Sequence, residues 1–287
     1  MCGRYAASRK PEELVELFQV SKWKPAETLA PDWNVAPTAD VYAVLERPDK
    51  ESGSPEPVRQ MRVLRWGLVP SWAKSPDIGV KMINARAESV HEKPSYRRPF
   101  ATHRCLLPAD GYYEWGLPAE GQGGRMSSAE ERQLEEQGKK KRPRKQPYFV
   151  TPADGSVMAM AGLYEFWRDR TLPDDHPKAW WATCTVITTE AETAPLTGDA
   201  AEGAVAGREP RSLFDIHPRM PLVLPPARWD AWLDSSRTDV DELRGLLVPA
   251  SAGFLRAYPV TTAVSNVRNN GPELVEPLPA PEEETLF

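Results

Sequence analysis

The second residue of the chain, Cys2, offers more reactive chemistry than any other position in the sequence. An initiator methionine is normally removed when the next residue is small, so we expect a mature chain that begins at Cys2. That terminus would carry an α-amine of pKa about 7.7 to 8 next to a thiol of pKa about 8.5. Both groups would then be partly nucleophilic at neutral pH.

Two kinds of reaction are open to such an aminothiol. The amine can act as general base for the thiol, as in N-terminal nucleophile hydrolases. Alternatively, the amine condenses with an aldehyde to an imine, and the thiol closes a five-membered thiazolidine ring. Gly3 allows close approach of the backbone, and the cation of Arg4 beside the thiol would favour the thiolate. These neighbours favour a functional Cys2 over an incidental terminal residue.

The elements that must position Cys2 are predicted to be mostly strands. The chain has 287 residues, 40% of them hydrophobic and 27% charged, which is enough for a sizeable core and excludes disordered or disulfide-scaffold chains. Short apolar runs bounded by turn residues are typical of strands. They cover 41–46, 61–66, 104–107, 111–115, 147–151, 157–164, 180–188, 220–224 and 255–260.

Helical patterning is limited to three segments. One is 11–20, with Ser8 as its N-cap; the second surrounds Trp229 and Trp232, and the third is 239–247. A strand-rich chain with a few peripheral helices predicts an α+β fold. We expect a single domain with a curled, mostly antiparallel mixed sheet as its barrel-like core.

The domain is expected to span 1–277, followed by an acidic tail over 278–287. Three stretches near 117–146, 168–178 and 191–211 have the composition of polar insertions.

The charge is distributed unevenly along the chain. A net charge of −5 speaks against a general, sequence-blind binder of nucleic acid. However, the last fifteen residues carry five glutamates and no basic residue, so the rest of the chain is neutral. Residues 61–110 hold nine lysines and arginines against four acidic residues. This basic middle part suits a surface that faces phosphates.

Several classes of protein are excluded by what the sequence lacks. No apolar run approaches the roughly 18 to 20 residues of a membrane span, and no secretory segment is seen, so we expect a cytoplasmic protein without a membrane partner. Cys2, Cys105 and Cys184 are too scattered for a zinc site, and Cys105 and Cys184 lie in strand-like runs as small apolar residues. We expect no metal and no cofactor.

Seven ordered blocks carry a resemblance to a known family. They are Met1-Cys2-Gly3-Arg4-Tyr5, Trp33-Asn34-Val35-Ala36-Pro37, the block 65–72 (RWGLVPSW), the block 83–88 (INARAE), the block 109–115 (ADGYYEW), the block 216–221 (IHPRMP) and the block 264–269 (VSNVRN). Together they resemble the SRAP family of SOS-response-associated, abasic-site-processing proteins, over nearly the whole chain.

The resemblance implies a role in the DNA damage response. Members of this family link themselves to abasic sites in single-stranded DNA, through a thiazolidine between the N-terminal cysteine and the aldehyde of the ring-opened sugar. They are also described as peptidases, because some remove residues ahead of that cysteine, so we expect a hydrolase-like or lyase-like enzyme. We expect a monomer that associates with the nucleoid and has single-stranded DNA with abasic sites as its partner.

The resemblance also implies site residues. Cys2 is the nucleophile, Glu114 matches the catalytic glutamate and would move protons, His217 matches the active-site histidine, and Asn84 matches the asparagine that orients the amine or the sugar. For DNA binding we expect Arg4, Asn34, Pro37, Trp66, Trp72, Lys81, Arg86 and Arg219.

The physical reasons for these DNA-binding residues differ. Arg4, Lys81 and Arg86 can hold phosphates, with Arg219 a weaker candidate. Trp66 and Trp72 can stack on unpaired bases, a contact worth about 1–3 kcal/mol, with Pro37 as a wedge beside them. Where the family often has a second tryptophan after Trp72, this chain has Ala73, so part of the wedge is missing.

Two other functions stay open. One is an N-terminal-nucleophile amidohydrolase of the glutamine amidotransferase type, since those chains also begin Met-Cys-Gly; glutaminase activity would identify it. The other is a non-catalytic module for single-stranded DNA, which would bind intact and abasic strands equally well and would not need Cys2.

Overall fold

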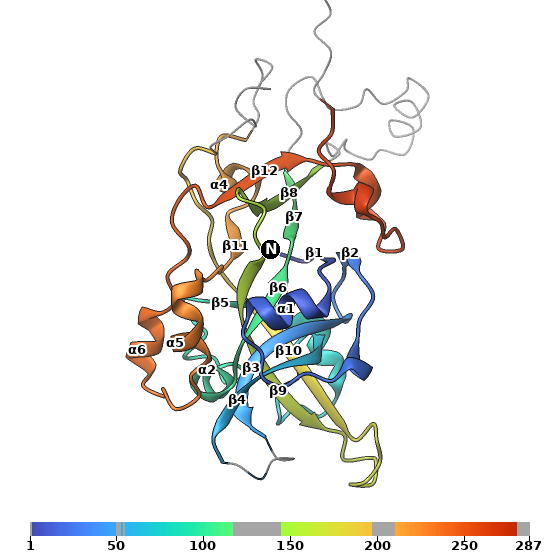
Figure 1. The fold of residues 1–287 in the computed structure, drawn as a ribbon, viewed down its shortest axis with the longest axis vertical. Coiled ribbons are helices and arrows are strands. Elements are labelled where there is room, and N and C mark those ends of the chain that lie inside the picture. The colour runs from blue at the N-terminus through green and yellow to red at the C-terminus, as the bar shows by residue number, and fades with distance from the viewer. Residues whose placement is uncertain (1, 50–52, 54, 117–144, 197–209, 280–287) are drawn as a thin grey trace, which may run out of the picture.

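The computed structural model describes residues 2–49, 53, 55–116, 145–196 and 210–279 (Figure 1). Its strands are β1 (Tyr5–Ala7), β2 (Asp32–Val35), β3 (Asp40–Pro48), β4 (Pro57–Trp66), β5 (Asn84–Arg86), β6 (Arg104–Ala109), β7 (Gly111–Gly116), β8 (Gln146–Pro152), β9 (Met158–Arg168), β10 (Trp180–Glu190), β11 (Arg219–Pro221) and β12 (Leu255–Pro259). The helices are α1 (Pro11–Leu17), α2 (Arg97–Thr102), α4 (Leu213–Ile216), α5 (Trp229–Leu233) and α6 (Val240–Gly245), with short 3-10 turns η1 (Pro25–Glu27), η2 (Pro76–Lys81), η3 (Pro226–Arg228), η4 (Thr262–Ser265) and η5 (Pro272–Val275).

The larger sheet closes on itself. Its order is β10-β4-β3-β6-β9, and β9 pairs back onto β10 over seven residue pairs from Trp180 and Arg168 to Val186 and Gly162. The pairs of β10 with β4 and with β5 are parallel, and the others are antiparallel. β5 and β11 extend along β10 beyond the closed part. The expected curled, mostly antiparallel, barrel-like sheet is therefore confirmed.

The smaller sheet carries the start of the chain. Its order is β12-β8-β7-β1-β2, with antiparallel neighbours throughout. It lies above the barrel in Figure 1, and the N-terminal segment enters between the two sheets. β1 runs between β7 and β2 in this sheet, which holds the residues just before it at the junction.

Alternation along the strands divides the core into clusters. In β3, Val41, Ala43 and Leu45 point into the barrel, where their cluster also contains Cys2. The intervening Tyr42 and Val44 join an outer cluster that α1, α2 and α5 cover with apolar side chains. This period of two is what a strand with both faces covered requires.

All nine predicted strands are present, although their ends differ by a few residues. β1, β2 and β5, each of three or four residues, and the helices α2 and α4 are not foreseen by the sequence patterns. Ser8 does not cap the first helix. Lys10 occupies the N-cap position and Pro11 is the first helical residue. Pro11 has no N–H that would need a capping acceptor. The backbone N–H of Ser8 donates instead to the carboxylate of Asp110.

The expected insertions belong only partly to the described residues. Residues 169–179 form the connection between β9 and β10. The other expected insertions and the acidic tail lie largely outside the described residues, which omit 117–144, 197–209 and 280–287. Of the lysine-rich run 139–145, only Lys145 is described. Within the described part of the chain, no helix is both long and apolar enough to cross a membrane.

The turn after β4 requires a glycine. Gly67 has φ +124°, a conformation that L side chains rarely adopt, and a Cβ there would lie 2.6 Å from the carbonyl oxygen of Gly79. The Gly67 N–H donates to the carbonyl of Cys184 at 2.8 Å. This close crossing joins the end of β4 to η2, which leads directly into β5 and Asn84.

We expect Gly67→Ala to lower the free energy of unfolding by about 2–3 kcal/mol, because it combines a strained φ with a backbone clash. Urea denaturation followed by circular dichroism measures the change. Gly245→Ala is the matched control, since Gly245 ends α6 and a methyl group added there would have nothing within 4 Å. Equal stability of the Gly67→Ala and Gly245→Ala proteins would contradict the role of the crossing.

Candidate active site

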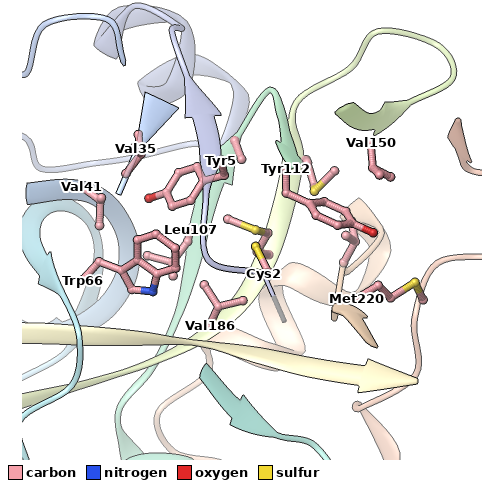
Figure 2. Packing of buried hydrophobic residues seen from close by; sticks show 14 of the residues in the cluster. Cys2, Tyr5, Val35, Val41, Trp66, Leu107, Tyr112, Val150, Val186 and Met220 are labelled. Atoms are coloured by element: carbon pink, nitrogen blue, oxygen red, sulfur yellow. The ribbon is translucent and has the colours of Figure 1, made fainter. Parts of the chain in front are cut away.

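Cys2 lies at the junction of the two sheets, in the segment that precedes β1. Cys2 is completely buried and belongs to the same apolar cluster as Trp66, Tyr112 and Val186 (Figure 2). Pairing of Tyr5 with Val35 on one side and with Tyr112 on the other fixes β1 in its sheet. The reactive side chain is therefore part of the core and not of a loose terminus.

The surroundings of Cys2 keep its thiol protonated. Burial raises the pKa of the thiol far above its ordinary value, and the negative charge of Glu114 raises it further. The positive N-terminus and the backbone N–H of Arg4 act in the opposite direction but are weaker. The expectation that Arg4 favours a thiolate is wrong, because its guanidinium turns away to the Oδ1 of Asn34 at 2.6 Å and the carbonyl of Val264 at 2.9 Å.

Asn84 holds the backbone of Cys2. Its Nδ2 donates to the carbonyl oxygen of Cys2 at 2.7 Å. β5 places it there because Asn84 is in parallel register with Val186 of β10, inside the cluster that surrounds Cys2. The Oδ1 of Asn84 is buried and accepts no hydrogen bond from the described residues, which leaves it as an acceptor beside Cys2. The Tyr96 hydroxyl donates to the Asn84 carbonyl at 3.2 Å and so supports this strand from the other side.

Glu114 reaches the same place from β7. Alternation along this strand turns Tyr112 and Glu114 to one face and Tyr113 to the other, where it joins a separate cluster. Glu114 is 6% exposed, so its carboxylate acts on Cys2 through little intervening water.

His217 completes the group. It follows α4, which begins with a capping box between Ser212 and Asp215, and its Nδ1 lies 3.9 Å from the Oε1 of Glu114. The backbone N–H of Arg219 donates to the same Nδ1 at 3.0 Å. The Arg219 carbonyl oxygen also lies 3.1 Å from this nitrogen, so Nδ1 has both a backbone donor and a backbone acceptor beside it.

Four residues expected from the sequence thus meet at one place, since Asn84, Glu114 and His217 converge on Cys2 or on its neighbour. The arrangement brings together a thiol, two groups of the kind that can transfer protons, and an amide that is bonded to the backbone of Cys2. Tyr112 and Tyr96 also belong to it but were not foreseen. The strand pattern around Glu114 could have identified Tyr112, because the two lie two residues apart on one face.

Two predicted DNA contacts are corrected by the structure. Trp66 is completely buried, and its Nε1 donates to the carbonyl of Ile83 at 2.9 Å, so neither face of the ring is open to a base. Asn34 is 3% exposed, and its Nδ2 donates to the carbonyls of Asn266 and Asn269 at 3.0 and 2.8 Å. Both side chains stabilise the fold.

Two of the predicted phosphate contacts are occupied by protein partners. Arg4 is bound to Asn34 and Val264, as described above. Arg219 makes a two-pronged ion pair with Glu88, at 2.6 and 3.0 Å, and donates to the Thr188 carbonyl at 2.6 Å.

Other predicted DNA contacts face solvent. Trp72 is 58% exposed, Lys81 and Arg86 are exposed, and Pro37 is half-buried. Lys81 ends η2 and Arg86 ends β5, so the two cations lie just before and just after the segment that presents Asn84. The described residues contain no group of three histidines, cysteines or carboxylates that could hold a metal ion.

Comparison with known proteins gives consistent results. Residues 1–267 match the family model described as SOS response associated peptidase (SRAP). The chain is 34% identical over 278 residues to the abasic site processing protein YoqW of Bacillus subtilis, covering 96% of this chain and 99% of that protein. It is 27% identical over 298 residues to the abasic site processing protein HMCES of Rattus norvegicus, covering 96% of this chain and 76% of that one.

Solved structures share the fold. A crystal structure of a protein from Bacteroides thetaiotaomicron superposes with a TM-score of 0.67 at 23% identity, covering 96% of this chain and all of that one. One from Bordetella bronchiseptica gives a TM-score of 0.59 at 23% identity, over 91% of this chain and all of that one.

The raised pKa of the Cys2 thiol predicts slow alkylation by iodoacetamide in the folded protein at pH 8, with a rate that climbs as the pH rises beyond the ordinary range of a thiol. We expect Glu114→Gln to increase the rate several-fold, because removal of the carboxylate charge lowers the thiol pKa. Peptide mass spectrometry after timed quenching measures alkylation at each cysteine.

Cys184 is the internal control. Its pKa is also raised by burial, but its charged neighbour is Asp40 and not Glu114. A rate at Cys2 that does not respond to Glu114→Gln, or an equal increase at Cys184, would show that Glu114 does not act on the Cys2 thiol.

Proposed function

Because the chain belongs to the SOS response associated peptidase (SRAP) family, we propose that it processes abasic sites in DNA by binding them covalently through Cys2. The observation that carries this proposal is the convergence of Asn84, Glu114 and His217 at the buried Cys2. The names of the relatives as abasic site processing proteins supply the substrate.

The proposed reaction begins once removal of Met1 frees the α-amine of Cys2. The amine adds to the aldehyde carbon of the ring-opened abasic sugar, and loss of one water molecule gives an imine. The thiol sulfur then bonds to the imine carbon while the thiol proton passes to the nitrogen. The product is a thiazolidine, and the whole sequence releases one water without any oxidant or reductant.

The residues of the site divide this work. Asn84 fixes the Cys2 carbonyl, and thereby the direction of the amine on the same residue. In the proposal, Glu114 takes a proton from the amine or thiol and returns it to the leaving hydroxyl, and His217, 3.9 Å from Glu114, relays that proton. A neutral thiol suits this route, because the Cys2 sulfur stays unreactive until an aldehyde enters the site.

The strand of DNA is proposed to be single and to lie across η2 and β5. Lys81 and Arg86 lie on both sides of Asn84 in sequence and are exposed, so they can hold the phosphates next to the abasic sugar. The exposed ring of Trp72 can stack on an unpaired base nearby. An abasic sugar in a single strand can also enter a buried site without any base pair being broken.

The direct test is an adduct that survives denaturation. Purified protein mixed with a single-stranded oligonucleotide that contains one abasic site should give a band of increased mass on a denaturing gel. We expect Cys2→Ala to abolish the band, and the oligonucleotide without the abasic site to give none. Glu114→Gln and His217→Ala should slow its formation at least tenfold, since general acid–base catalysis typically contributes about 10²–10⁴-fold.

Cys184→Ala is the matched control, because Cys184 is equally buried in the same cluster but takes no part in the reaction. An adduct that persists in Cys2→Ala would remove the proposed nucleophile. No adduct with the unaltered protein, together with equal affinity for intact and abasic strands, would instead identify a non-covalent binding module.

Salt dependence tests the proposed phosphate contacts. We expect Lys81→Ala and Arg86→Ala each to reduce the slope of log affinity against log salt by about 0.7, the contribution of one phosphate contact in a single strand. Fluorescence anisotropy with the Cys2→Ala protein, which cannot react, measures binding at several salt concentrations. Arg244→Ala on α6 removes an exposed cation elsewhere and should leave the slope unchanged; equal slopes for all three variants would place the strand on another surface.

A further inference from the structure

A hollow of about 470 Å³ lies at the end of the barrel away from Cys2. It is found where β3 and β9 end and β10 begins, and it is lined among others by Arg47, Arg98, His103, Tyr164, Phe166 and Trp180. The connection after β9 is at the bottom of Figure 1, far from the N-terminus. Trp180 precedes Val186 by six residues on β10, which is about 20 Å of strand. This hollow is therefore separate from the site at Cys2.

One wall of the hollow is aromatic. The ring of His103 stacks on Tyr164 with centroids 4.9 Å apart and planes 25° apart. Glu165, which is 4% exposed, lies beside the histidine, with its Oε1 3.5 Å from the Nδ1 of His103, and the same oxygen accepts from the N–H of Phe166 at 3.0 Å. Next to this wall Trp180 is 58% exposed, so an aromatic face is open to a ligand.

Two guanidinium groups supply positive charge. Arg47 lies 4.8 Å above the ring of Phe166, which holds it in place by a cation–π contact. Arg98 is exposed on α2. Neither forms an ion pair with a carboxylate of the described residues, whereas the nearby Glu46 is occupied by Arg59 at 2.9 and 2.7 Å. Both cations are thus available to an anion.

We propose that this hollow binds a nucleotide unit, with its base stacked on Trp180 and its phosphate held by Arg47 and Arg98. Arginine is the side chain best suited to phosphate oxygens, because its planar fork can donate two parallel hydrogen bonds. The volume is within the range of pockets for small ligands, which often lie at the mouths of barrels. A purely apolar ligand would leave the two guanidiniums unused, and an inorganic anion would leave the tryptophan unused.

The nucleotide unit has two sources. It is either a free mononucleotide or one nucleotide of a DNA strand that also reaches the first site. At the 3.4 Å rise of a stacked strand, the roughly 20 Å along β10 correspond to about six nucleotides. Binding of a free mononucleotide is independent of the proposed function, whereas binding of a strand rests on it.

The test uses the full chain carrying Cys2→Ala, so that only non-covalent binding is measured. The probes are dAMP, an intact 15-nucleotide single strand and an intact 5-nucleotide strand, each titrated by calorimetry. We expect Trp180→Ala and Arg98→Glu each to weaken binding at least tenfold. Arg97→Glu changes the same charge on the same helix at a residue that does not line the hollow, and Leu17→Ala removes an apolar side chain that is 42% exposed on α1. Neither should change the affinity.

The pattern of losses identifies the source. If dAMP binds and both variants weaken it, the ligand is a free mononucleotide. If both variants weaken the 15-nucleotide strand but not the 5-nucleotide strand, the unit belongs to DNA. The inference is overturned if neither variant differs from its control with any probe. Since Trp180 and Arg98 are exposed, the variants should fold, and thermal melts check this.

Failure here leaves the proposed function intact. With Cys2 restored, a 5-nucleotide strand with a central abasic site should still form the covalent adduct in both Trp180→Ala and Arg98→Glu. If the unaltered protein forms no adduct, the proposed role of Cys2 is contradicted. The calorimetric result for the hollow does not depend on that reaction and still stands.

Discussion

The hydrogen bond from Asn84 to the carbonyl of Cys2 is the contact on which the candidate active site depends. A chain terminus normally frays, because few contacts offset the entropy of ordering it. Here the 2.7 Å bond from Nδ2 ties Cys2 to β5, and β5 is itself paired with β10 of the barrel. The same segment continues into β1 of the other sheet. The reactive residue is therefore fixed by both sheets at once.

This placement has an electrostatic consequence. Inside the core, the thiol is kept neutral by burial and by the charge of Glu114, and the Nδ1 of His217 lies 3.9 Å from an oxygen of that carboxylate. The proposed reaction does not require Cys2 to be a thiolate in the free protein. In the proposed reaction, selectivity would come from which groups can reach the buried site, and the aldehyde of an abasic sugar in a single strand is a small group of this kind. The weak overall charge is compatible with such a protein, because a covalent bond does not require tight prior binding.

Much of the fold follows from the sequence, and the exceptions have physical reasons. Runs such as those of β3 and β9 are long enough for their apolar pattern and turn residues to be seen, whereas β1, β2 and β5 have three or four residues and show no period. The resemblance pointed to Asn84, Glu114 and His217, but not to the contacts that bring them together. Those contacts join residues far apart in the chain, such as Asn84 with Cys2 and His217 with Glu114. Trp66 and Trp72 look alike in sequence, each near glycine or proline. They differ in position, because Trp66 is the last residue of β4 and lies in the core, whereas Trp72 follows the strand and lies in solvent. Likewise, nothing near Arg4 in the sequence reveals that Val264 captures its side chain.

The central claim is that Cys2 forms a closed ring with the aldehyde of an abasic site, and the intact mass of the adduct tests it most directly. We expect a protein that has lost Met1, plus the oligonucleotide, minus one water molecule, with peptide mapping that places the DNA on Cys2 and no need for a reducing agent. An adduct found only after reduction with borohydride and mapped to a lysine, or no mass increase at all, would contradict it.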